Sequence, residues 1–107
     1  MGSKIKPAKE LDSGKMSVSL DRNMLEVLIH ALECCIVFDR EDLPIPFFFL
    51  IQEVCVKLQK HELGGGGRIA LRKSEFFALA DPEVVKHLDE PTGILLREVM
   101  TPRRQIG

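Results

Sequence analysis

The chain has 107 residues, 45% of them hydrophobic and 29% charged, which predicts one globular domain with a single core. Its formal net charge of −1 gives no overall field to attract nucleic acid or an anionic membrane, and no apolar run approaches the roughly 20 residues of a membrane span. The three cysteines, two of them adjacent, make a poor disulfide framework, so we expect a reducing compartment, the cytoplasm or the nucleus.

Residues 1–16 have the composition of a flexible basic arm. They include four lysines, a proline and two glycines, with few large apolar side chains. Such a segment cannot bury enough surface to offset the entropy lost on ordering. We therefore place the folded domain at residues 17–101.

The clearest helical pattern runs from Ser19 to Phe38. Ser19 can cap this helix, and Asp21 in the first turn complements the helix dipole. Apolar side chains fill most of its circumference, which predicts a central helix with neighbours on several flanks. The polar side chains form one narrow stripe, made of Asn23, Glu26, His30 and Glu33.

A second helix is predicted from Pro46 to Glu62. It follows a stiff connector, Leu43-Pro44-Ile45-Pro46, in which each residue before a proline is held extended. On a helical wheel one face of this helix is apolar and is expected to lie in the core. That face contains Phe47, Ile51, Val54, Cys55 and Leu58, with Phe48 and Leu50 at its margins.

The opposite sector of the second helix is mostly polar, but Phe49 and Val56 lie in the middle of it. They are seven positions apart and therefore on one line. Burial of a phenylalanine contributes roughly 1.5 to 3 kcal/mol, so a later segment or a binding partner should cover this line. We interpret it as the candidate partner-binding surface, together with its polar neighbours Gln52, Glu53 and Lys60.

Four consecutive glycines, Gly64–Gly67, end the second helix. One glycine suffices for a helix cap, so the run indicates either a natural flexible loop or an engineered linker. A phosphate-binding loop does not fit, because the Walker pattern requires Gly-Lys-Ser/Thr after its four spacers, whereas Arg68-Ile69-Ala70-Leu71 follows here.

The remaining elements are short. A helix over residues 69–80 is favoured over an extended entry followed by a helix capped by Ser74, because a strand at residues 69–71 would be isolated and unstable alone. Asp81-Pro82-Glu83 predicts the start of a brief helix, and Thr92 can cap a last one. The expected fold is all-α, a compact bundle of about five helices. Residues 102–107 are expected to be a tail or the start of a linker.

Candidate catalytic and metal-binding residues are few. His30 and Cys34 lie one helical turn apart, a workable spacing for two metal ligands, to which Cys55 or His61 could add. The chain has no Cys-x-x-Cys pair, however, and cysteines in apolar helices are ordinarily core residues. His61 and His87 stand in polar surroundings and are predicted to be surface residues. We therefore expect no metal, no cofactor and no enzymatic activity.

The sequence thus favours a non-enzymatic protein-protein interaction module of a larger intracellular protein, an adaptor or scaffold that binds an amphipathic helix or a short apolar peptide. A homodimerisation domain is the alternative. A nucleic-acid-binding domain is less favoured, since the charge is near zero and no known motif accompanies the basic patch of Arg68, Arg72, Lys73, Arg103 and Arg104.

Overall fold

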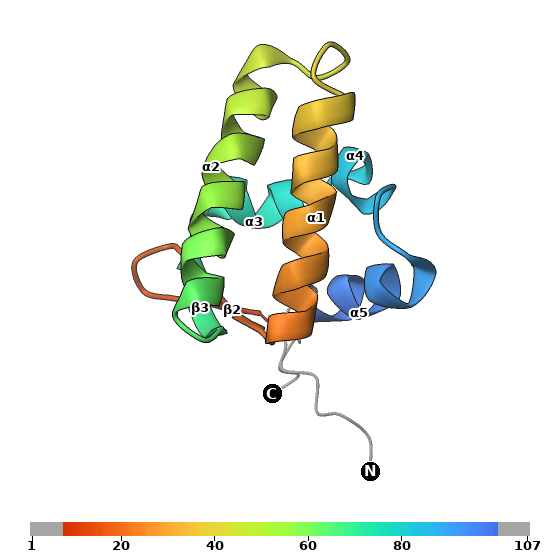
Figure 1. The fold of residues 1–107 in the computed structure, drawn as a ribbon. Helices are drawn as coiled ribbons and strands as arrows, with labels where there is room; N and C mark the ends of the chain where they lie inside the picture. The colour runs from red at the N-terminus through yellow and green to blue at the C-terminus, as the bar shows by residue number, and fades with distance from the viewer. Residues whose placement is uncertain (1–7, 101–107) are drawn as a thin grey trace.

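The computed structural model describes residues 8–100, which fold into five helices and a three-stranded antiparallel sheet (Figure 1). The expectation of an all-α bundle is therefore wrong, and the fold is mixed α/β. In chain order the elements are β1 (Lys9–Glu10), β2 (Met16–Leu20), α1 (Arg22–Phe38), α2 (Ile45–Leu63), β3 (Gly67–Leu71), α3 (Lys73–Leu79), α4 (Pro82–Val85) and α5 (Glu90–Met100).

The sheet has the order β1-β2-β3, so β2 is its central strand. β2 pairs with β3 from Met16 opposite Leu71 to Leu20 opposite Gly67, which means that the predicted isolation of residues 69–71 was wrong. β1 pairs with the start of β2. Lys9, Glu10 and Met16 of the expected arm therefore belong to the sheet, and residues 11–15 form the turn between β1 and β2. Residues 1–7 and the expected tail lie outside the described residues.

The N-cap of α1 lies two residues later than expected. Ser19 lies in β2, and the helix is capped instead by Asp21, whose carboxylate accepts a hydrogen bond of 2.7 Å from the Met24 N–H. At the other end the Asp39 N–H donates to the carbonyl oxygen of Cys35 at 3.1 Å. The predicted helix therefore exists, with its cap shifted by a strand that precedes it.

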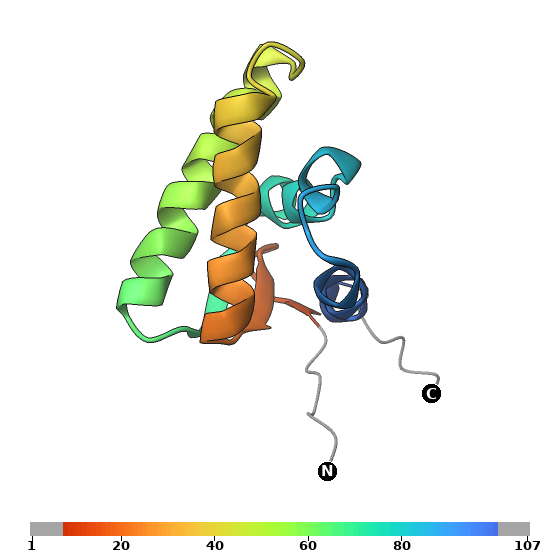
Figure 2. The same cartoon turned by 45° about the vertical axis from the view of Figure 1, so that its right-hand side comes forward.

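α1 and α2 run antiparallel, side by side, and form one layer of the molecule (Figure 1). A turned view shows the sheet and α3, α4 and α5 together on one side of this pair (Figure 2). We call the side toward these elements the inner face and the opposite side the outer face. The core lies at the inner face, and its largest fully buried side chains include Leu20, Leu25, Leu28, Leu32, Ile51, Leu58, Leu71, Phe76, Leu79 and Leu96.

The predicted core face of α2 is largely confirmed. Ile51, Val54, Cys55 and Leu58 are buried, and Phe47 is half-buried against the same core. The turn after α2 needs its glycines, because Gly65, Gly66 and Gly67 all have positive φ. At Gly66 an added Cβ would also meet the Leu20 carbonyl oxygen at 3.3 Å, so a side chain there would require β2 to shift slightly, in addition to the strain of the positive φ.

The single helix expected over residues 69–80 is instead a strand and a helix. β3 ends at Leu71 and α3 starts at Lys73, with Arg72 rather than Ser74 at its N-cap. α4 begins as predicted, with the Asp81 carboxylate accepting from the Glu83 N–H at 2.9 Å. α5 starts at Glu90, before the predicted cap at Thr92.

Candidate functional site

The two apolar residues singled out on α2 both lie on the outer face. Phe49 is 57% and Val56 48% exposed. The sequence allowed a later segment of the chain to cover these two residues. The later helices do not do so, because Phe76 and Leu79 of α3 are buried in the core and α5 lies beside β2.

These two residues belong to a longer apolar line. Ile45 and Leu63, at the two ends of α2, project in nearly the same direction as Phe49 and Val56 and are also exposed. We call Ile45, Phe49, Val56 and Leu63 the α2 line. It follows the whole length of the helix, and no other element in residues 8–100 packs over it.

A groove of about 590 Å³ runs beside the α2 line, between α1 and α2. Val37, Phe38 and Val56 give it exposed apolar walls, and the amide of Gln59 donates to the Glu33 carboxylate across it at 3.4 Å. The groove is lined by His30, Glu33, Cys34, Ile36, Val37, Phe38, Gln52, Cys55, Val56 and Gln59. Its apolar end lies near the α1–α2 connector, and Glu33 and Gln59 make its other end polar.

The polar residues predicted around Phe49 have different surroundings. Gln52 lines the groove, whereas Glu53 turns toward α3 and accepts from the Arg72 guanidinium at 2.8 Å. Lys60 is exposed on the side of Glu53, and these residues border a shallow hollow of about 560 Å³ on α2. The structure therefore leaves Gln52 beside the groove and separates Glu53 from it.

A buried carboxylate fixes α3 to α2. The Glu75 side chain is only 4% exposed and accepts from the Lys57 ammonium at 2.9 Å and the Arg72 N–H at 2.8 Å. Burial opposes ionisation of Glu75, but these bonds outweigh it and lower the pKa of the carboxyl below its ordinary value. Glu75 is thus a structural anchor.

The basic patch considered for nucleic acid is largely engaged within the protein. Arg68 donates to the Ser17 hydroxyl at 2.9 Å, Arg72 bonds to two glutamates, and Lys73 lies 3.3 Å from the Glu10 carboxylate. Arg103 and Arg104 are outside the described residues. These contacts give the nucleic-acid hypothesis no added support.

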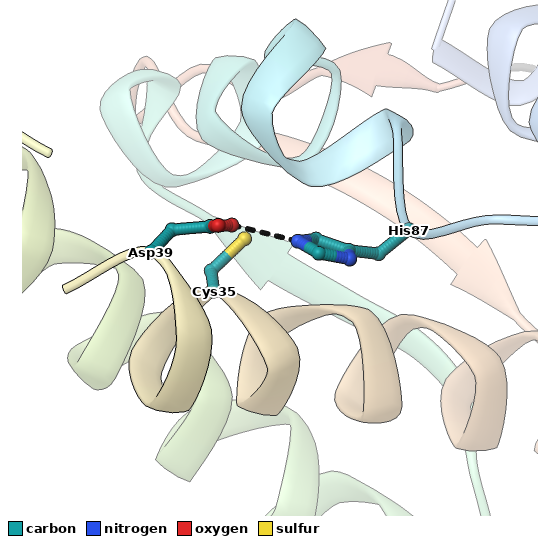
Figure 3. A group of neighbouring side chains, drawn as sticks. All are labelled: Cys35, Asp39 and His87. Carbon is teal, nitrogen blue, oxygen red and sulfur yellow. Dashed lines mark hydrogen bonds and ion pairs between the residues drawn. The ribbon is translucent and has the colours of Figure 1, made fainter. Parts of the chain in front are cut away.

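A second cluster, formed by Cys35, Asp39 and His87, was not predicted. Cys35 and Asp39 lie one turn apart at the end of α1, and their side chains meet that of His87, which follows α4 (Figure 3). His87 Nε2 lies 2.7 Å from Asp39 Oδ2, and the side chain of His87 is only 20% exposed. His87 is therefore only partly exposed, and it bonds to a buried aspartate, a contact that the sequence did not predict.

Burial and neighbouring charges set the protonation states of Cys35 and Asp39. Burial, with the Asp39 carboxylate adding to it, raises the pKa of Cys35 to about 11, and its thiol donates to the Glu83 carbonyl oxygen at 3.2 Å. The hydrogen bond from His87 lowers the pKa of Asp39, and the Lys86 ammonium 3.5 Å away adds to the effect. Cys35 is therefore a neutral thiol at physiological pH and is poorly suited to nucleophilic attack.

The metal ligands weighed in the sequence converge only in part: His30 and Cys34 meet, and Cys55 lines the same groove, but they do not form a group of three. His30 Nε2 and Cys34 Sγ are 3.6 Å apart on the exposed side of α1, but His61 pairs with the Gly67 carbonyl oxygen at 3.0 Å. Within residues 8–100, Cys35, Asp39 and His87 are the one group of three or more candidate ligands. The i, i+4 spacing of Cys35 and Asp39 was visible in the sequence, but nothing there placed His87 beside them.

Comparison with protein-family models, with curated proteins and with solved structures finds no match. Among residues 8–100, none of the helices has the length and apolar character needed to cross a membrane. Function must therefore be argued from the geometry of the chain itself.

Proposed function

We propose that this chain is a non-enzymatic protein-interaction module whose outer face binds an amphipathic helix of a partner protein. The observation that carries the proposal is the α2 line, four apolar side chains that remain exposed on the outer face, one of which, Val56, also lines the groove between α1 and α2. Covering one phenylalanine such as Phe49 would contribute roughly 1.5 to 3 kcal/mol to association.

The shape of the outer face favours a helical occupant. Phe49 and Val56 are two helical turns apart, about 10.5 Å along the axis, so they match apolar side chains at positions i and i+7 of a helix lying beside α2. The groove then accepts the side chains that this helix directs between α1 and α2. A few large anchors of this kind supply most of the energy in such interfaces.

The charge on the outer face favours a basic flank on the occupant. α1 exposes Glu26 and Glu33 on this side, and Glu33 lines the groove itself. A second copy of the chain packed with α1 against α1 would bring these carboxylates together, which is unfavourable. We therefore propose a partner helix with one apolar face and a Lys/Arg-rich flank toward α1.

The Cys35 thiol gives no support to nucleophilic catalysis. It is protonated and buried, so it does not offer an accessible nucleophile.

Selection from a displayed library of amphipathic helices tests the proposal directly. We expect enriched sequences that bind the unmodified chain and Phe77→Ala equally but fail to bind the double variant Phe49→Ala, Val56→Ala. Phe77 is the matched control because it is also an exposed phenylalanine, but on α3. Enriched helices that bind the double variant as tightly as the unmodified chain would exclude the outer face as the site.

Light scattering over a concentration series distinguishes a module that binds a partner helix from the alternative, a homodimerisation domain. A constant monomer mass is expected. A mass that doubles with concentration, and stays monomeric in Phe49→Ala, Val56→Ala, would replace the proposed partner by a second copy of the chain.

A further inference from the structure

The cluster at the end of α1 combines three donor types that a transition metal accepts: a thiol sulfur, a carboxylate oxygen and an imidazole nitrogen. The ligand atoms of Cys35, Asp39 and His87 all lie within 4.8 Å of one another. Mixed sulfur, nitrogen and oxygen sets of this kind suit Zn²⁺. We propose that these three residues bind one divalent transition-metal ion of the zinc type.

The distances require shifts on the order of 1 Å, since Cys35 Sγ can lie as far as 4.8 Å from the other two ligand atoms. Tetrahedral zinc bonds of 2.0–2.3 Å place neighbouring ligand atoms about 3.3 to 3.6 Å apart. His87 Nε2 and Asp39 Oδ2 are 2.7 Å apart and must separate by less than about 1 Å. Asp39 follows the last residue of α1 and His87 follows α4, so both side chains can rotate without breaking a helix (Figure 3).

The burial of the cluster suits a bound ion. Cys35 and Asp39 are buried, and the partly exposed His87 leaves one side open to solvent. A metal held from this side would keep a fourth position for water, while the protein shields its other ligands. The ion would join the end of α1 to the segment after α4.

Binding exchanges hydrogen bonds for metal bonds. The Cys35 thiol gives up its proton to solvent together with its bond to the Glu83 carbonyl oxygen. His87 releases the Nε2 proton that it donates to Asp39 and carries its proton on Nδ1 after exchange with solvent, so that Nε2 is free to bind. The carboxylate of Asp39 leaves the Lys86 ammonium, which keeps the Glu83 carboxylate as a partner at 3.0 Å. Lys86 thus competes with the metal for Asp39.

Titration of the full chain with Co²⁺ under a non-thiol reductant tests the site. We expect one equivalent to bind with the near-ultraviolet charge-transfer absorption of a cobalt–thiolate bond and the visible bands of tetrahedral cobalt. Added Zn²⁺ should remove both and raise the thermal unfolding midpoint. Cys35→Ser should lose the charge-transfer absorption, and His87→Gln should weaken binding about tenfold or more.

The rival thiolate site is His30 with Cys34, whose Nε2 and Sγ are 3.6 Å apart on the exposed side of α1. Cys34→Ser is therefore the matched control and should bind Co²⁺ as the unmodified chain does. Loss of the absorption in Cys34→Ser, with its retention in His87→Gln, would overturn the proposal. Absence of any cobalt–thiolate absorption in the unmodified chain would do the same.

Three variants make the test independent of folding defects and of the proposed function. His87→Gln changes a partly exposed side chain and decides the outcome if Cys35→Ser fails to fold. Lys86→Gln should bind Co²⁺ more tightly, because the competing ammonium is gone; unchanged or weaker binding would count against Asp39 as a ligand. Phe49→Ala, Val56→Ala should bind Co²⁺ normally, since the outer face takes no part.

Discussion

Leu58 and Leu63 lie five residues apart on α2, yet Leu58 is fully buried whereas Leu63 is 89% exposed. Leu58 belongs to the inner face, where side chains from both layers pack closely. Leu63 belongs to the α2 line on the outer face, which no element in residues 8–100 covers. Two apolar stripes on one helix therefore have different surroundings: one packs in the core and stabilises the fold, and the other stays exposed.

Leu→Ala substitutions at these two positions should give the largest difference in the free energy of unfolding between the inner and outer faces. Leu58→Ala should lower the free energy of unfolding by about 2 to 5 kcal/mol, because it removes buried methyl groups and leaves a cavity. Leu63→Ala should change it by less than about 0.5 kcal/mol. Chemical denaturation measures both, and similar losses would mean that the outer face is packed.

Glu75→Gln tests the polar contacts of the inner face. Because the buried carboxylate holds Lys57 and the N–H of Arg72, we expect a loss of about 1 to 2 kcal/mol in the free energy of unfolding. The matched change Glu53→Gln affects an exposed partner of the same arginine and should cost less than about 0.5 kcal/mol. Equal effects in urea unfolding would show that burial of Glu75 is unimportant.

Asp39 should make stability depend on acid pH. Its pKa is lowered in the folded state by the hydrogen bond from His87, so it contributes stability above the unfolded pKa of about 3.9. That contribution is lost as pH falls through the folded value. Urea unfolding with a chelator over about pH 2 to 5 should show a shallower acid decline in Asp39→Asn than in the exposed control Asp42→Asn.

Phe49→Ala with Val56→Ala should have the smallest effect on stability and the largest on binding. Both side chains are about half exposed or more, so we expect the helical circular dichroism and the melting midpoint to change little. Association with the partner helix should be abolished. A loss of stability comparable with that of Leu58→Ala would instead assign this pair to the core.

The helices were predictable because their evidence is local. The 3.6-residue period placed α1 and α2, and Asp81 with Pro82 marked α4. The same wheel separated Phe49 and Val56 from the core face, and both residues are exposed in the structure. Whether a partner covers them stays a prediction, because a sequence pattern shows a face and not its occupant.

The sheet was missed because its stability is not local. Met16, Val18 and Leu20 alternate with serines, which is a strand pattern, but the pairing partner of β2 lies some 50 residues away at residues 67–71. Judged alone, residues 69–71 were too short to be stable. The contact of Asp39 with His87 spans 48 residues and depends on the same tertiary arrangement.

The pairing of β2 with β3 also fixes the spacing of α1 and α2, the two helices that form the groove. β2 leads into α1, and β3 follows α2 after the glycine turn, so the strand pair ties together the two helix ends that are far from the α1–α2 connector. Residues 39–44 tie the other two ends. The spacing between the helices is therefore fixed before anything binds. A partner helix would lose its own freedom without having to order its site, which lowers the entropic cost of association.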